Sequence, residues 1–205
     1  MNEENRFNLS KGYLLNQNFW DDLYKTNSIG WDLGKVSPPI KTFINTLENK
    51  NISILIPGCG NSYEAEYLLQ QGFTNISLID ISPTLVENLK QKFEKNSKIK
   101  VFLIDFFEHK GKYDLIIEQT FFCALPPIVR QQYVLKMHQL LVKGGKLAGL
   151  LFDKTFEESP PFGGSRAEYE LLFLPFFEFI KLELCQNSVK PRANTELFFE
   201  FRKKT

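Results

Sequence analysis

Cysteine and net charge are both scarce in this chain of 205 residues, and each shortage excludes a class of protein. The three cysteines, Cys59, Cys123 and Cys185, are odd in number and fit no zinc-binding spacing. This usage favours a reduced, cytoplasmic compartment over a disulfide framework, and no metal site is predicted. The 25 basic and 24 acidic residues give a formal net charge of +1. Because a duplex-binding surface needs clustered positive charge, we expect no nucleic-acid partner.

Long apolar segments, internal repeats and low-complexity linkers are also missing. No stretch approaches 18 apolar residues and the polar N-terminus has no signal-peptide core, so we expect neither a membrane span nor secretion. Hydrophobic residues make up 43% and charged residues 24%, a balance typical of globular domains. The sequence predicts one monomeric domain over residues 1–205, with a helical lid over 1–50 and a core over 51–205. The two histidines, His109 and His138, are expected at the surface.

Strand-like and helix-like segments alternate after residue 50. Strands are expected over residues 52–56, 76–79, 100–104, 113–117 and 146–152, and helices over 62–70, 83–93, 128–141 and 168–174. This alternation predicts a mostly parallel sheet with helices on both faces. Two further strand-like runs, 178–185 and 196–202, have no helix between them, so their hairpin adds an antiparallel strand. The predicted fold is α/β, a Rossmann-like doubly wound sheet with the layout of class I methyltransferases.

Glycine and acidic residues follow the predicted strands, where open α/β sheets bind ligands. The first strand ends in Gly58-Cys59-Gly60, whose glycines let the backbone approach a ligand closely. Asp80 ends the second strand, about 20 residues later, where its carboxylate can accept hydrogen bonds from ribose hydroxyls. Asp105 ends the third strand and can accept from an adenine amino group, with Phe106 beside the ring. A structural tight turn also explains the glycines alone, but glycines and acids together indicate an adenosine ligand.

A dinucleotide fits this pattern less well. The G-x-G-x-x-G fingerprint needs glycine at position 63 for close helix–strand packing, and the chain has Tyr63 there. A bulky residue at the start of the helix favours a single nucleoside without a pyrophosphate.

Several longer stretches match a known family. They are FW at 19–20, GWDLGKVSPP at 30–39, LIPGCGNSYE at 55–64, LIDIS at 78–82, DFF at 105–107, YDLI at 113–116, TFFCALPP at 120–127, GGKL at 144–147, PPF at 160–162 and EYE at 168–170. In these stretches the chain resembles the thiopurine methyltransferase superfamily, and most closely its plant and microbial halide and thiol methyltransferases. GWD…PP and TFFCAL are much more specific than the generic cofactor motif.

The resemblance implies an enzyme that uses S-adenosyl-L-methionine and releases S-adenosyl-L-homocysteine. Its acceptor would be a small soft nucleophile, such as a thiol, a thiopurine-like compound, a halide or thiocyanate. The N-terminal segment would close over the cofactor. Together with the strand-end pattern, the resemblance indicates cofactor contacts at Trp20, Trp31, Gly58, Cys59, Gly60, Asp80, Ile81, Asp105, Phe106 and Gln119. Relatives have Tyr or Arg at the position of Gln119, so the identity of the acceptor does not transfer.

No catalytic residue is predicted, because a sulfonium methyl group is already electrophilic and its transfer needs mainly position and dehydration. Trp31, Phe121 and Phe122 are expected near the acceptor, where cation–π attraction worth about 0.5–2 kcal/mol can stabilise the sulfonium. Arg192 is expected at the acceptor side, where it could attract an anion. An NAD-dependent oxidoreductase and a non-catalytic protein that binds S-adenosylmethionine are the alternative functions.

Overall fold

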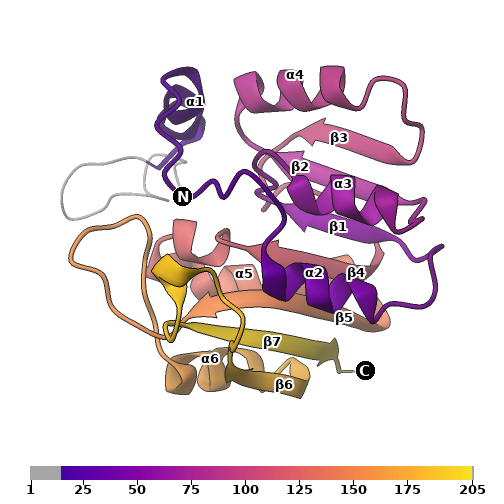
Figure 1. Cartoon of the computed structure of the whole chain (residues 1–205). Helices are drawn as coiled ribbons and strands as arrows, with labels where there is room; N and C mark the ends of the chain where they lie inside the picture. The colour runs from indigo at the N-terminus through magenta and orange to yellow at the C-terminus, as the bar shows by residue number, and fades with distance from the viewer. Residues whose placement is uncertain (1–14, 205) are drawn as a thin grey trace.

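The computed structural model describes residues 15–204, so the first 14 residues of the predicted lid lie outside the described residues. Seven strands form one sheet in the order β3-β2-β1-β4-β5-β7-β6 (Figure 1). The strands are β1 (Ile54–Pro57), β2 (Ile76–Asp80), β3 (Ile99–Leu103), β4 (Tyr113–Gln119), β5 (Leu141–Phe152), β6 (Phe177–Leu184) and β7 (Glu196–Lys203). The α-helices are α1 (Gln17–Lys25), α2 (Pro38–Asn45), α3 (Tyr63–Gln70), α4 (Pro83–Lys92), α5 (Arg130–Leu140) and α6 (Arg166–Phe173). Short 3-10 turns are η2 (Phe122–Ala124), η3 (Pro127–Val129) and η4 (Lys190–Arg192).

The pairing of the strands confirms the predicted fold class. Strands β1 to β5 pair in parallel, whereas β7 runs antiparallel to both β5 and β6. The chain therefore enters the sheet at β1, builds outward to β3, returns through β4 and β5, and closes with the predicted hairpin. In the hairpin of β6 and β7, the second strand, β7, pairs with β5 of the parallel sheet, and the first strand, β6, forms the edge.

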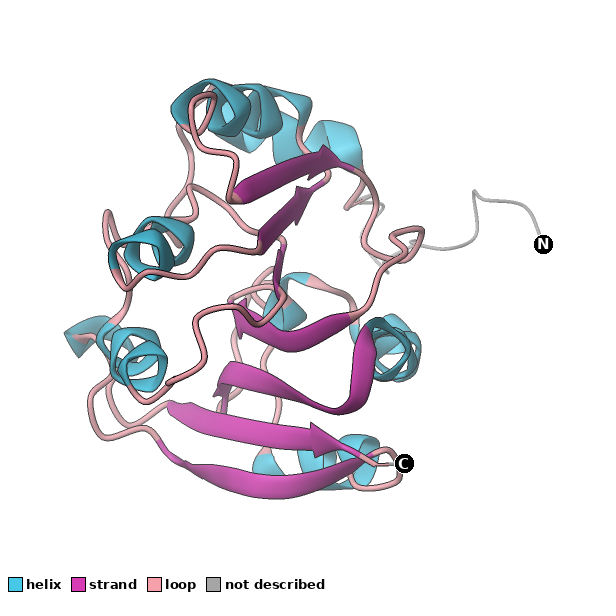
Figure 2. Ribbon diagram, turned by 90° about the vertical axis from the view of Figure 1, so that its right-hand side faces the viewer, coloured by secondary structure: helices cyan, strands magenta, loops and turns pink. Residues whose placement is uncertain are grey.

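Figure 2 shows helices on both faces of the sheet, and alternate strand residues pack in two separate apolar clusters. Ile54 and Ile56 of β1 pack in one cluster with apolar residues of α2, α3 and α4. Leu55, between them, packs in a second cluster with residues of α5 and α6. The two-residue period of a strand thus supplies both layers of the core.

The boundary between α5 and β5 differs from the prediction. The prediction has a helix over 128–141 and a strand over 146–152, with Gly144 and Gly145 in the connection that ends the helix. Instead β5 begins at Leu141, directly after α5, and the glycines form an irregularity within it. Gly144 has a φ of +72°, and a Cβ on Gly145 would lie 3.0 Å from the carbonyl oxygen of Tyr113. The glycines therefore fit a bulge against β4, and the helix ends where the strand pairing begins.

The expectation for His109 is wrong. Its side chain is buried, and Nε2 lies 2.8 Å from Oη of Tyr113. His138 is half-buried. Among residues 15–204, no helix combines the length and apolarity that crossing a bilayer requires.

Candidate active site

A cavity of about 720 Å³ opens at the carboxyl ends of the parallel strands. In Figure 1, α1, the loop after β5 and the loop between β6 and β7 gather at this end of the sheet. The predicted site residues that line the cavity are Trp20, Trp31, Gly58, Cys59, Gly60, Asp80, Ile81, Asp105, Phe106, Gln119, Phe121 and Arg192. One predicted acceptor-side residue, Phe122, does not.

The turn after β1 is shaped by its glycines. Gly58 and Gly60 have φ angles of +54° and +51°, a region that side chains with a Cβ rarely adopt. A Cβ on Gly58 would lie 2.2 Å from Cδ2 of Phe121. The glycine therefore makes room for an aromatic ring of the cavity wall, as well as turning the backbone toward the cavity. Cys59 points into the core and is buried, as a small hydrophobic residue.

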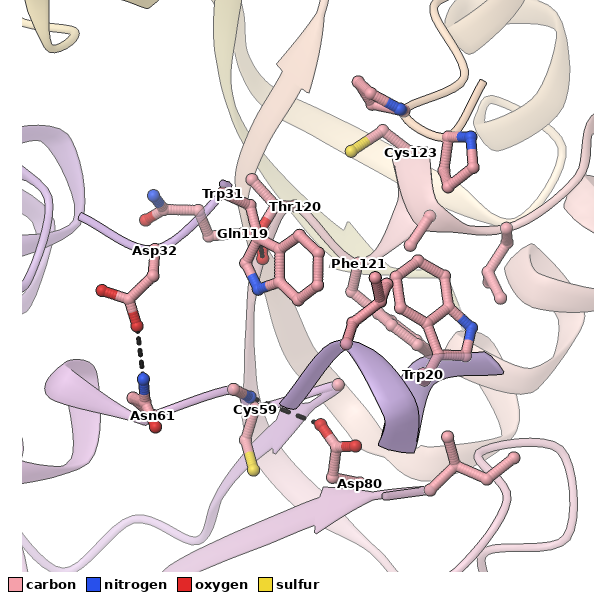
Figure 3. A pocket seen from close by; sticks show the side chains of 18 of the residues that line it. Trp20, Trp31, Asp32, Cys59, Asn61, Asp80, Gln119, Thr120, Phe121 and Cys123 are labelled. Carbon is pink, nitrogen blue, oxygen red and sulfur yellow. Dashed lines mark hydrogen bonds between the residues drawn. The ribbon is translucent and has the colours of Figure 1, made fainter. Parts of the chain in front are cut away.

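Asp80, the last residue of β2, brings a carboxylate to the buried end of the cavity. Its Oδ1 accepts from the amide of Ser82 at 3.0 Å, and its Oδ2 faces the amide of Gly60 at 3.4 Å (Figure 3). The residue is only 8% exposed, and burial raises the pKa of Asp80 to about 6. A carboxylate so placed retains acceptor capacity for hydroxyl groups of a ligand.

Beside Asp80 the wall becomes apolar. Ile81 and the buried Phe106 line it, and the rings of Phe106 and Phe121 meet edge to face at 5.1 Å. Asp105 accepts from the amide of Phe107 at 2.7 Å, which fixes the direction of its carboxylate at the cavity. This combination of flat apolar surface and carboxylates fits an adenosine group.

Two tryptophans from the N-terminal segment cover the opposite side. The rings of Trp20 and Trp31 pack edge to face at 5.7 Å, and Tyr24 packs on Trp31 at 5.9 Å. In Figure 3 the two indoles lie on either side of Phe121, and Asp80 lies below them. Aromatic faces in this position can stabilise a sulfonium cation.

Asp21 docks α1 on the start of α4. Its Oδ1 accepts from Oγ of Ser82 at 2.6 Å and from the amide of Thr84 at 2.8 Å, and Lys25 pairs with Oδ2 at 2.7 Å. Burial alone would raise the pKa of Asp21, but the hydrogen bonds from Lys25, Ser82 and Thr84 hold it well below its usual range. The helix that carries Trp20 is thereby fixed beside the strand that carries Asp80.

The expectation that Phe122 faces the acceptor is wrong. Thr120 has a φ of +59°, and η2 follows, so the two phenylalanines point to different sides. Oε1 of Glu118 accepts from the amides of both Phe121 and Phe122, at 2.7 and 2.8 Å. Phe121 reaches the cavity, while Phe122 is 1% exposed and packs on Tyr133 in the core.

Glu118 itself is a buried acid behind this turn. It is fully buried, its Oε2 has no hydrogen-bond partner within residues 15–204, and burial raises its pKa to about 7. Glu118, near the end of β4, therefore holds the turn and does not line the cavity.

Arg192, in η4, reaches the cavity from the C-terminal side. Its Nη2 donates to the carbonyl oxygen of Trp31 at 2.9 Å, and its Nη1 lies 3.7 Å from Oε1 of Glu196. Nη1 makes no hydrogen bond among the described residues. The side chain lines the cavity but is only 12% exposed, and Nη1 is a buried donor without a hydrogen bond in the described part of the chain.

Polar pairs around the cavity were missed by the sequence prediction. Oγ of Ser37 donates to Oε1 of Gln119 at 2.6 Å, and Asp32 accepts from Asn61 and Tyr63. Ser37, Asp32 and Asn61 lie within matched stretches, but their partners are distant in sequence. Nothing in the sequence alone pairs them.

Comparison with known proteins places this geometry in a family. The family model for thiopurine S-methyltransferase matches residues 15–204. The chain belongs to the thiopurine S-methyltransferase family. Membership of this family makes it an S-adenosylmethionine-dependent methyltransferase, which confirms the predicted enzyme class against the NAD-dependent and non-catalytic alternatives.

Relatives within this family include plant and bacterial proteins. The chain is 36% identical over 191 residues to "Probable thiol methyltransferase 2" of Arabidopsis thaliana, covering 90% of this chain and 84% of the plant protein. It is 28% identical over 185 residues to "Thiopurine S-methyltransferase" of Acinetobacter baylyi, covering 78% of this chain and 84% of that protein.

A solved structure shares the fold. The 1,6-didemethyltoxoflavin-N1-methyltransferase of Burkholderia thailandensis, solved with 1,6-didemethyltoxoflavin and S-adenosylhomocysteine bound, superposes with a TM-score of 0.74 at 16% identity. The matched region covers 92% of this chain and 87% of the chain in that structure. At that identity the likeness concerns the fold, a class I methyltransferase sheet, and not the acceptor.

Proposed function

We propose that this methyltransferase transfers its methyl group to a small organic thiol, preferably one that carries an anionic group. The observation that carries the proposal is the lining of the cavity, which beyond the residues of the cofactor end includes an apolar group, here called the apolar arm, and the cations Arg192 and Lys154. The walls of this arm are Ala124, Pro126, Phe152, Phe156, Pro160 and Pro161. A monatomic halide would leave most of this surface without contact, whereas an organic thiol would cover it.

The cofactor end has residues suited to S-adenosylmethionine. Asp80 would accept from the ribose hydroxyls, and Asp105 with Ile81 and Phe106 would hold the adenine. When bound, S-adenosylmethionine supplies an electrophilic methyl group on a sulfonium. Trp31 and Phe121 would face that group, with Trp20 packed behind Trp31. Their role is to orient the reactants and exclude water, which raises the nucleophilicity of a soft anion.

The acceptor needs no dedicated base. A thiol with an ordinary pKa near 8.5 is already a few per cent thiolate at neutral pH. The guanidinium of Arg192, with Nη1 free of hydrogen bonds in the described part of the chain, would attract the acceptor's anionic group. Glu196, whose Oε1 lies 3.7 Å from Nη1, partly balances the charge of Arg192.

We further propose that the enzyme is a cytoplasmic monomer that acts on neither nucleic acid nor membranes. The near-zero net charge and the three free, buried cysteines support this.

A screen with S-adenosylmethionine labelled on the methyl group tests the acceptor. The panel pairs thiols with and without a carboxylate, and adds iodide, thiocyanate, a protein extract and RNA. We expect transfer to organic thiols, with higher kcat/KM for the carboxylate-bearing member of each pair. Methylation of protein or RNA with none of any small thiol or halide would overturn the proposal. Thermal stabilisation by S-adenosylhomocysteine, but not by NAD, checks the cofactor independently.

A further inference from the structure

The segment between α1 and α2 lines the cavity, and the carboxylate of Asp32 ties it to the residues at the start of α3. Its Oδ2 accepts from Nδ2 of Asn61 at 2.5 Å. The hydroxyl of Tyr63 lies 3.1 and 3.2 Å from its two oxygens, and the amide of Gly34 donates to Oδ1 at 2.6 Å. With three donors around it, the carboxylate is occupied by protein groups rather than by the cavity.

Two of these donors, Asn61 and Tyr63, come from the other side of the cavity. Asn61 follows the glycine turn after β1, and Tyr63 begins α3. Lys92 of α4 supports both, because its Nζ donates to the carbonyl oxygen of Asn61 at 2.9 Å and lies 5.4 Å from the centre of the Tyr63 ring. Burial and the neighbouring Asp32 raise the pKa of Tyr63, so its hydroxyl stays protonated and able to donate.

The residue before Asp32 is Trp31, and its carbonyl oxygen accepts from Arg192 on the C-terminal side of the cavity. The backbone that carries the Trp31 indole is therefore tied on one side to the start of α3 and on the other to η4. Figure 3 shows Asp32 bonded to Asn61 on one side of the indole and Cys123 on the other.

We infer that Asp32 is a positioning residue that, through Tyr63 and Asn61, holds Trp31 over the bound cofactor and slows the release of S-adenosylhomocysteine. The inference rests on the proposed binding of the cofactor beneath Trp31. It also gives a reason for tyrosine at position 63, where a dinucleotide-binding turn would have glycine. The bulky side chain reaches across the turn instead of clearing space for a pyrophosphate.

Tyr63→Phe tests the inference with the loss of a single hydroxyl. Tyr67→Phe is the matched control, because Tyr67 lies on the same helix and its hydroxyl bonds Asn45 away from the cavity. Dissociation of S-adenosylhomocysteine is followed by stopped-flow fluorescence of the two tryptophans, Trp20 and Trp31. We expect dissociation to be about tenfold faster in Tyr63→Phe, the loss expected for one hydrogen bond to a charged group, and unchanged in Tyr67→Phe.

Asp32→Asn, alone and with Tyr63→Phe, tests whether the two residues act through the same contact. If they do, the acceleration of dissociation in the double variant should be well below the product of the accelerations in the two single variants. Equal dissociation rates in wild type, Tyr63→Phe and Tyr67→Phe would overturn the inference, and so would equal acceleration by both Tyr variants.

Hydrogen exchange in the unliganded protein separates this inference from the proposed function. The amide of Gly34 donates to Asp32, so it should exchange at least about threefold faster in Tyr63→Phe than in Tyr67→Phe. Unchanged exchange at Gly34 would contradict the contact itself. If exchange changes as expected but wild-type protein binds no S-adenosylhomocysteine, the cofactor assignment fails and the role of Asp32 in product release fails with it.

Discussion

Gly58 and Phe121 meet so closely that the glycine has no space for a side chain. A Cβ on Gly58 would lie 2.2 Å from Cδ2 and 2.8 Å from Cγ of the Phe121 ring. The Phe121 ring has little room to turn away, because it packs against the rings of Phe106 and Tyr133 and its backbone amide is bonded to the buried Glu118 at 2.7 Å. The glycine turn after β1 and the aromatic turn after β4 therefore form one packed unit at the centre of the cavity wall.

Gly58→Ala should consequently destabilise the protein and impair binding of S-adenosylhomocysteine. The backbone strain at a φ of +54° costs about 1–2 kcal/mol, and overpacking against Phe121 adds about 1–3 kcal/mol. Urea unfolding and calorimetry measure the two effects.

Gly72→Ala is the control for backbone strain, since Gly72 has a φ of +88° but nothing within 4 Å of its Cβ position. Gly72→Ala should lose only the roughly 1–2 kcal/mol that backbone strain costs, and it should bind S-adenosylhomocysteine with wild-type affinity. Similar losses in the two variants would show that contact with Phe121 contributes nothing.

The affinity for S-adenosylhomocysteine should fall as the pH drops through about 6. Burial raises the pKa of Asp80 to about 6, and its carboxylate form is the stronger acceptor for ribose hydroxyls. Between pH 7.5 and 5 an increasing fraction of the free protein is protonated at Asp80, so binding weakens in that direction.

Asp80→Ala should remove this pH dependence and weaken binding at pH 7.5 by about 1–3 kcal/mol, as expected when charge-assisted hydrogen bonds are lost. Calorimetry at both pH values measures each quantity. Wild-type affinity in the variant would remove Asp80 from the site.

The sheet and the cofactor end were accessible from sequence because they depend on local patterns. Buried strands read as short β-branched runs, and ligands of such sheets bind at the ends where Gly58 and Asp80 stand. The cap of α4 by Ser82 was likewise predictable, because it needs only a hydroxyl just before the helix.

Orientation and long-range pairing were not accessible. Phe121 and Phe122 are chemically alike, and only the positive φ of Thr120 and the bonds to Glu118 decide which ring reaches the cavity. The contact between Asp32 and Tyr63 joins residues 31 positions apart in sequence and depends on how the N-terminal segment crosses the sheet. Gly144 and Gly145 misled the prediction because the same residues stop helices and form bulges.

Glu118→Gln should raise stability at alkaline pH. The pKa of Glu118 lies near 7 in the folded protein and near 4.5 when exposed, so the folded state holds a proton that the unfolded chain releases between these values. The free energy of unfolding therefore falls as the pH rises through this window, by up to about 3 kcal/mol from this residue.

Glutamine keeps an oxygen for the amides of Phe121 and Phe122 but carries no charge. The stability gain over wild type, from urea unfolding, should grow from pH 5 to pH 8. Glu94→Gln, at an exposed position, is the control and should show no such growth. A gain independent of pH would mean that the buried charge is not the cause.

Arg192→Ala should raise KM for anionic acceptors more than for neutral ones. Arg192 lines the cavity, and its buried Nη1 makes no hydrogen bond among the described residues, so its charge is poorly compensated by the protein and would attract an acceptor carboxylate. A charge-assisted bond there is worth about 1.5–3 kcal/mol, so KM for a carboxylate-bearing thiol should rise by about tenfold or more. KM for a neutral thiol of the same size should rise much less.

Arg192 also donates to the carbonyl oxygen of Trp31, so the variant should release S-adenosylhomocysteine faster. This acceleration should be the same whichever acceptor is used. Lys190→Ala is the matched control, since Lys190 lies in the same turn but is exposed to solvent. Steady-state kinetics with a pair of thiols that differ only in the carboxylate separates the two roles. If KM rises equally for both thiols, Arg192 acts only through Trp31 and the anionic group of the acceptor is bound elsewhere.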